Sequence, residues 1–332
     1  MPDNPKIRRI RKGRKMKMKQ EHFEGWYIRQ QAAQDGRIRA LALIPGCHTD
    51  ENGVKTAILQ VVTTEKSYTV MYPARSFRAD PKGFRIRCGR NYFSKSGVIL
   101  DIETRELSLH GRLYYSAFHS PKRPVFRFSK RPALCFSKRP AFCFSKRRMP
   151  GPGCMIAGGG CRNEIVSIRH RVCGRLTLNG TPMVFRNGLG YIESERRASL
   201  PRRYMRTQCN SFRKESGVNG LMAAAAEISL PWMTFRSCVC RIYYQGRGYR
   251  MATCLGARVL RMSERLTIIR QGQYRLIIHC MGKNPVRLKV PVRGSLKSAA
   301  DLYVSCPVRY IFCRGSEVLF YETAEGAGYQ YG

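Results

Sequence analysis

The sequence predicts an all-β protein in which antiparallel strands close into barrels or sandwiches, with few short helices. Short runs of alternating apolar and polar residues recur along the chain and stop at Gly, Pro, Asn or Asp, which is typical of strands and turns. Four hairpin signatures follow one another in the second half. The length of 332 residues adds the expectation of about two domains, at roughly 100–200 residues each.

The first of these domains is expected over residues 21–120, as an N-terminal β lobe. It begins at the aromatic cluster Phe23-Glu24-Gly25-Trp26-Tyr27, after which apolar runs alternate with turn residues. Runs of this length, bounded by Pro and Gly, favour short strands over helices. The expected strands cover residues 40–44, 56–62, 67–72, 84–88 and 91–94.

The second domain is expected over residues 161–332, as a C-terminal β lobe. Its four hairpins turn at Asn179-Gly180, at residues 245–248, at Gln271-Gly272 and at Arg314-Gly315. Asn-Gly in particular favours the tight turn that joins two twisted strands. The best helical candidate is residues 221–228, because its alanine run has high helix propensity. A strand of small residues is the alternative for this segment.

Two basic segments fall outside the predicted lobes. Residues 1–20 contain nine Lys or Arg and one acid, which predicts a disordered tail that could also serve as a membrane-surface or nucleic-acid arm. Residues 121–160 are expected to form a linker loop. They contain a tandem octad, in which each unit carries Phe-Ser-Lys-Arg followed by Pro or Arg, and then a Gly-rich stretch. One Pro in most units opposes both a helix and a central strand.

Charge and cysteine content narrow the classes of function. With 61 Lys and Arg against 21 Asp and Glu, the net charge is +40, which favours a polyanion or an anionic membrane as a partner. We find no secretory signal and no apolar run long enough to span a bilayer, and therefore expect a cytoplasmic protein, with peripheral membrane association as the alternative. The 14 cysteines include no Cys-x-x-Cys pair, so we expect no metal site.

Several phrases of the sequence match one known family in order. They are Phe23-Glu-Gly-Trp-Tyr27, Ala42-Leu-Ile-Pro-Gly46, Gly174-Arg-Leu-Thr-Leu-Asn-Gly180, Gly188-Leu-Gly-Tyr-Ile-Glu193 and Gln208-Cys-Asn210. Over about residues 22–112 and 161–329 the chain resembles the tocopherol cyclase family, including its bacterial tocopherol-cyclase-like members. The resemblance implies two related calycin-like or lipocalin-like lobes. It also implies a cofactor-free, acid-catalysed cyclisation that converts a prenylated quinol lipid into a chromanol.

That chemistry requires an acid that is protonated near neutral pH, in an apolar pocket that shelters a carbocation. The resemblance places this acid in the block that contains Tyr191, Glu193 and Glu195, and we take these three as candidate catalytic residues. On a strand, two residues that are two positions apart share one face, so the two glutamates would raise the pKa of one of them. The alternative is that they form salt bridges with Arg196, Arg197 and the nearby arginines of residues 202–203.

Five further residues are candidates for binding the substrate. Glu24 and Trp26 could line the mouth of a barrel, and His170 could relay a proton. Gln208 and Asn210 could hydrogen-bond a quinol hydroxyl. Each also has a purely structural alternative. Polar residues on strands often hydrogen-bond to the neighbouring backbone, and an aromatic residue at the start of a barrel often fills its base.

The chain departs from the family pattern where the pocket is expected. Arg196 and Arg206 stand where the family has Trp, and Arg197 stands where it has Gly. These changes remove aromatic faces that stabilise a cation and add charges that repel one. Two other functions therefore stay open: a non-catalytic lipid-binding protein of the same fold, and a polyanion-binding or nucleic-acid-binding protein that uses the basic segments.

Overall fold

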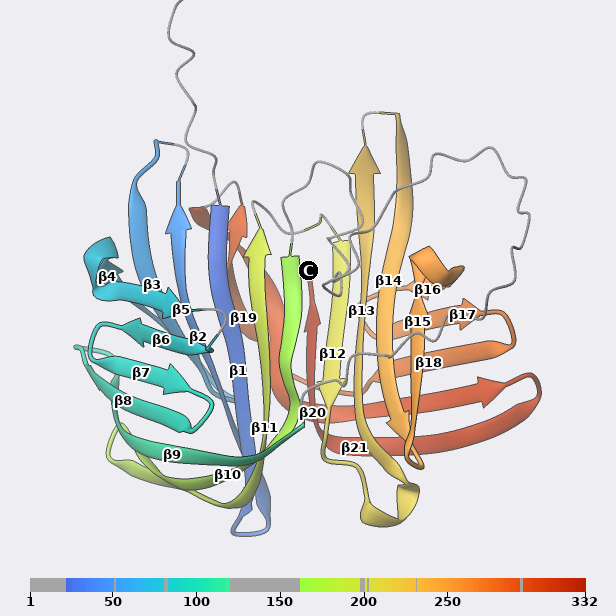
Figure 1. The fold of residues 1–332 in the computed structure, drawn as a ribbon, viewed down its shortest axis with the longest axis horizontal. Helices are drawn as coiled ribbons and strands as arrows, with labels where there is room; N and C mark the ends of the chain where they lie inside the picture. The colour runs from blue at the N-terminus through green and yellow to red at the C-terminus, as the bar shows by residue number, and fades with distance from the viewer. Residues whose placement is uncertain are drawn as a thin grey trace, which may run out of the picture.

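The computed structural model describes residues 22–50, 52–80, 83–119, 162–197, 201, 203–230, 232–292 and 295–332, and it confirms the all-β prediction (Figure 1). Within these ranges, helical structure is limited to the three-residue 3-10 turns η1 (Ala74–Ser76), η3 (Lys214–Ser216) and η4 (Thr253–Leu255). Over the same part of the chain, no helix is long and apolar enough to cross a bilayer.

The first sheet contains eleven antiparallel strands in the order β4-β3-β2-β1-β11-β10-β9-β8-β7-β6-β5. The last strand, β11, pairs with the first, and the single turn η1 joins the two edge strands β4 and β5, so the sheet curls into a nearly closed barrel (Figure 1). The strands are β1 (His22–Gln34), β2 (Arg37–Thr49), β3 (Lys55–Val62), β4 (Ser67–Pro73), β5 (Phe77–Asp80), β6 (Arg85–Cys88), β7 (Asn91–Ser94), β8 (Gly97–Glu103), β9 (Ser108–His119), β10 (Arg162–Leu178) and β11 (Thr181–Arg197).

The second sheet repeats this plan. Its order is β15-β14-β13-β12-β21-β20-β18-β17-β16, with β19 paired to β20 outside that path. Again the last strand pairs with the first, and again a 3-10 turn, η4, joins the two edge strands. The strands are β12 (Arg203–Cys209), β13 (Val218–Leu230), β14 (Met233–Tyr244), β15 (Arg247–Ala252), β16 (Arg258–Met262), β17 (Leu266–Gln271), β18 (Tyr274–Cys280), β19 (Val286–Val292), β20 (Ser295–Arg314) and β21 (Glu317–Tyr331).

The division between the lobes differs from the expected one. The second lobe was expected over residues 161–332, but β10 and β11 belong to the first sheet, where β10 pairs with β9. The lobes therefore meet between β11 and β12. The reason is barrel closure, since β1 needs a partner on its open side and finds it in β11. Residues 120–161 connect β9 to β10 within the first lobe and do not link the two lobes.

Three apolar cores result from the alternation of side chains along the strands. One fills the first barrel, one fills the second, and a third lies between the lobes and draws residues from both sheets. Strand β13 shows how one segment serves two cores. Ala223 and Ala225 point into the second barrel, whereas Ala224 and Ala226 point into the layer between the lobes. Strands at the lobe interface are thus buried on both faces.

This packing overturns the helical candidate at residues 221–228. The segment is part of β13, which is hydrogen-bonded to β12 on one side and to β14 on the other. Tertiary pairing overrides the helix propensity of alanine here. Small side chains suit this strand because both of its faces are packed against an apolar core.

The hairpin signatures are confirmed as hairpins. Asn179 and Gly180 both have positive φ angles, +47° and +79°, as the tight turn between β10 and β11 requires. Gln245 and Gly246 form the same kind of turn, which is two residues shorter than expected because β15 already begins at Arg247. The basic tail of residues 1–20, the octad tract and the Gly-rich stretch lie outside the described residues.

Candidate functional site between the lobes

The first strand of each lobe carries the same pattern of three side chains toward the other lobe. In β1 it is Tyr27-x-Arg29-x-Gln31, and in β12 it is Tyr204-x-Arg206-x-Gln208. Tyr27 and Tyr204 both lie in the apolar layer between the lobes, and the period of two on a strand places the Arg and Gln on the same face. This repeat was not predicted from the sequence, although its Tyr-x-Arg-x-Gln spacing is visible there.

Arg206 reaches from the second lobe to a buried carboxylate of the first. Its guanidinium forms an ion pair with Glu193, and it lies 5.1 Å from the centroid of the Tyr27 ring. The same Glu193 oxygen accepts a hydrogen bond from the Tyr191 hydroxyl at 2.6 Å. Glu193 is only 3% exposed. A carboxylate, a phenol and a guanidinium thus form one buried polar cluster, with the Tyr27 ring as its wall.

The electrostatics of this cluster depend on burial and on the ion pair. Burial raises the pKa of Glu193 above the ordinary value of a glutamate, while Arg206 and the Tyr191 hydroxyl act in the opposite direction. Burial by itself would lower the pKa of Arg206, but Glu193 and Tyr191 raise it above its ordinary value. Arg206 therefore keeps its proton, and Glu193 is the group of the pair that can exchange one.

Glu195 shares the face of Glu193, as the strand periodicity predicted, and lies nearer the surface, where it is half-buried. The expected arginine partners differ from the observed one. Arg196 points to the opposite face of β11 and binds Glu24 at 3.1 Å. Arg203 is exposed, and the side chains of Arg197 and Arg202 lie outside the described residues. The pairing cation comes from β12, the next strand in the chain but a member of the other sheet, so no pattern within one strand indicated it.

Trp26, Glu24 and His170 lie away from this cluster. Trp26 and Glu24 lie on the opposite face of β1 from Tyr27. Trp26 is buried in the core of the first barrel, where the centroid of its ring lies 6.3 Å from that of Phe77. His170 is also buried in the first lobe, where its ring stacks on Phe118 at 4.7 Å. None of these three candidates contacts Glu193.

His170 is held as a neutral ring. Burial lowers its pKa to about 3. Its Nδ1 lies 3.1 Å from the hydroxyl of Ser167, and its Nε2 has no hydrogen-bond partner among the described residues. The ring covers Gly190, where a Cβ atom would lie 2.1 Å from Nε2. The glycine is therefore what allows the histidine to sit against β11.

Gln208 and Asn210 do face the layer between the lobes. Gln208 accepts a hydrogen bond from Arg29 at 3.3 Å, while its Nε2 has no partner within the described chain. Asn210 donates to the carbonyl oxygen of Gly190 at 2.8 Å. Both side chains thus connect the second lobe to the first at the buried end of the cluster.

Arg29 is the counterpart of Arg206 and reaches in the opposite direction. It is 1% exposed, and it donates to the carbonyl oxygens of Val304 at 2.5 Å and Gly326 at 2.7 Å, both in the second lobe. It also donates to the side chain of Gln31. In contrast to Arg206, Arg29 forms no ion pair with any carboxylate in the described chain, so neutral acceptors alone hold this buried cation.

Metal-binding clusters of three or more His, Cys, Asp or Glu side chains are absent from the described ranges. Of the cysteines in those ranges, all but Cys173 and Cys254 are buried, where a free cysteine packs as a small apolar residue.

Comparison with known proteins gives the fold but no family. No family model matches the chain, and no curated protein matches it. Among solved structures, a putative AttH from Nitrosomonas europaea is similar with a TM-score of 0.52 and 13% identity, covering 93% of this chain and 92% of that one. CghA is similar with a TM-score of 0.53 and 12% identity, covering 94% and 87%. CghA with Sch210972 has a TM-score of 0.51, 12% identity, and coverage of 94% and 88%. The chain therefore shares the two-lobed calycin-like fold of these proteins over nearly its whole length.

Proposed function

We propose that this protein is a cofactor-free enzyme that transfers a proton to an amphipathic lipid, and specifically a tocopherol-cyclase-like cyclase of prenylated quinols. The observation that carries the proposal is Glu193, a carboxyl group whose burial between two lobes raises its pKa. A carboxylic acid with a raised pKa is suited to protonate an alkene near neutral pH.

The surroundings of Glu193 fit the rest of that reaction. Tyr27 and Tyr191 meet edge to face at 6.4 Å, and aromatic faces stabilise a neighbouring cation. The layer around them is made mainly of Ala, Val, Ile and Leu side chains, which favour the prenyl chain over water. Ring closure releases the proton of the quinol hydroxyl, and the Tyr191 hydroxyl, which donates a hydrogen bond to Glu193, can relay that proton to the carboxylate.

The test is a cyclisation assay on a prenylated quinol with wild-type protein and Glu193→Gln. Activity is expected to fall as pH rises through the raised pKa, because only the protonated acid reacts, and Glu193→Gln is expected to abolish it. Tyr191→Phe should reduce the rate without removing the acid. Glu227→Gln is the control, since Glu227 is another glutamate that pairs with an arginine, at 3.7 Å from Arg236, but it is half-buried and lies on β13. A Glu193→Gln variant that folds and cyclises at the wild-type rate would refute the role of Glu193.

A second candidate function, lipid binding without catalysis, is favoured by Arg206. This cation stands where the resemblance expects Trp, and it lies within contact of the carboxyl group that would have to donate its proton. A protein that binds the quinol and never cyclises it would establish this function. In that case Arg206→Trp, which removes the charge and restores an aromatic face, is the variant in which activity should be sought.

A further inference from the structure

A cleft of about 750 Å³ opens on the first lobe, at the seam where the two edge strands of its barrel meet. Its wall runs from Tyr72 at the end of β4, through Arg75 of η1, to Arg78 of β5 and Arg87 of β6. The last residues of β8 close the other side. The volume lies within the range of small-molecule sites, about 300–1,000 Å³. The cleft is separate from the cluster around Glu193, which faces the second lobe.

Four arginines line this cleft: Arg75, Arg78, Arg87 and Arg90, all exposed. Within the part of the chain that the structure describes, Arg75 and Arg78 form no ion pair. Arg87 donates only to the carbonyl oxygen of Gly89, at 3.3 Å. Only Arg90 has an acidic partner, Asp101, at 3.4 Å. Most of the positive charge of the wall is therefore uncompensated by the protein.

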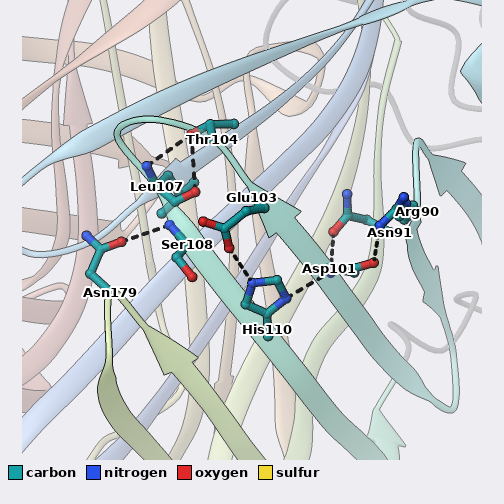
Figure 2. A network of polar contacts seen from close by, with 9 residues as sticks. All are labelled: Arg90, Asn91, Asp101, Glu103, Thr104, Leu107, Ser108, His110 and Asn179. Atoms are coloured by element: carbon teal, nitrogen blue, oxygen red, sulfur yellow. Dashed lines mark hydrogen bonds and ion pairs between the residues drawn. The ribbon is translucent and has the colours of Figure 1, made fainter.

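The two acidic side chains of the cleft both bind the same histidine. His110 lies between Asp101 and Glu103, 3.0 Å from the first and 2.9 Å from the second (Figure 2). The hydrogen bond with Glu103 raises the pKa of His110, and Asp101 acts in the same direction against the opposing effect of desolvation. A protonated imidazole between the two carboxylates cancels part of their charge. The arginine wall consequently keeps its attraction for an external anion.

We propose that this cleft binds a phosphate group carried on a small organic molecule. Guanidinium groups donate two parallel hydrogen bonds to phosphate oxygens, and an arginine cluster is the usual way to hold such a dianion. Tyr72 and Val70 supply an apolar surface beside the arginines for the body of the ligand. A free phosphorylated metabolite and the head group of a phospholipid both offer this chemistry.

The test compares two double variants of the full chain by isothermal titration calorimetry at physiological salt. Arg75→Gln/Arg78→Gln removes two charges from the cleft. Arg258→Gln/Arg261→Gln removes two exposed charges from β16, an edge strand of the second sheet, and so controls for net charge and for edge position. The probes are inorganic pyrophosphate and monomeric dioctanoyl phosphatidic acid. All four side chains are exposed, so both variants are expected to unfold at the wild-type temperature.

We expect the cleft variant to weaken binding at least about tenfold and the control by less than about twofold, because only the first loses charge-assisted hydrogen bonds to the phosphate. Loss of pyrophosphate binding would identify a free phosphorylated molecule as the source, and loss confined to the lipid probe would identify a head group. Equal weakening in both variants, or no binding by the wild-type protein, would overturn the proposal. The arginines would then serve only to keep the edge strands β4 and β5 from pairing with other chains.

Discussion

At the scale of single residues, His170 and Glu193 are both buried titratable groups, and burial acts on them in opposite senses. The pKa of His170 is lowered because its charged form is a cation that loses hydration, whereas that of Glu193 is raised because its charged form is an anion. Of the two, only Glu193 pairs with a charged group and accepts a hydrogen bond from a phenol, which is the arrangement expected of a group that exchanges protons.

The lowered pKa of His170 predicts a loss of stability in mild acid. Between its unfolded pKa of 6.5 and its folded pKa of about 3, the unfolded chain binds a proton that the folded chain does not. The free energy of unfolding should therefore fall with decreasing pH by up to about 1.4 kcal/mol per pH unit from this group. Urea unfolding between pH 6.5 and 4.5 measures the slope.

His170→Phe should reduce that slope, because phenylalanine can stack on Phe118 and does not titrate. His279→Gln is the matched control, because it replaces a histidine that is only half-buried, on β18. An unchanged slope in His170→Phe would mean that other groups cause the acid sensitivity.

At the scale of elements, strand β13 illustrates how packing on two faces selects residue size. Ala225 is 1% exposed and lies opposite Met205 and Cys238 of its two neighbouring strands. Valine at this position has the better strand propensity, yet it adds two methyl groups to a filled core. We expect the unfavourable packing of valine to outweigh its better strand propensity, just as tertiary packing outweighs the helix propensity of the alanine run.

We therefore predict that Ala225→Val lowers the free energy of unfolding by about 1–3 kcal/mol through overpacking. Ser229→Val, at an exposed position of the same strand, should be neutral or slightly stabilising. Urea denaturation of the two variants beside the wild type gives both values. An Ala225→Val protein as stable as the wild type would contradict the prediction, because it would mean that the core of the second barrel can accommodate two more methyl groups.

At the scale of the whole molecule, two arginines join the lobes in opposite directions. Arg29 extends from the first lobe to backbone carbonyls of the second, and Arg206 extends from the second lobe to Glu193 of the first. Two further hydrogen bonds join the lobes. The Gln60 side chain donates to the carbonyl oxygen of Lys289 at 3.0 Å, and the Ser67 hydroxyl donates to the carbonyl oxygen of Arg287 at 2.7 Å. An interface of this kind, with its own apolar core, should make the two barrels unfold together.

Arg29→Met should then destabilise the protein by about 3 kcal/mol or more, because it leaves the carbonyl oxygens of Val304 and Gly326 buried without a donor. Arg39→Met, at an exposed position of β2, should have little effect. Calorimetry is the measurement, with a single transition expected for the wild type. Two separate transitions in the wild type would contradict the coupling of the lobes.

The basic tail gives a prediction about the molecule's partner. Residues 1–20 lie outside the described residues, and their nine Lys and Arg should attract anionic lipid at about 1 kcal/mol each near the surface. Binding to phosphatidylserine vesicles should fall steeply with salt and be reduced by deleting residues 2–19. Equal binding to neutral vesicles would refute an electrostatic attachment, and preference for RNA would support the polyanion-binding alternative.

The sequence alone determined the local structure and the strand face of the candidate acid. Alternating runs placed the strands, Asn-Gly and related pairs placed the turns, and the spacing of two put Glu193 and Glu195 on one face, because each of these depends on a few neighbouring residues. Only the tertiary structure decided that residues 162–197 close the first barrel, that the alanine run is a strand, and that Arg206 is the partner of Glu193. The first outcome depends on the pairing of β1 with β11, which are far apart in the chain, and the other two depend on how the strands pack in the folded lobes, where burial outweighs local preference. The same holds for the arginine cleft, which exists only because the edges of a curled sheet meet at η1.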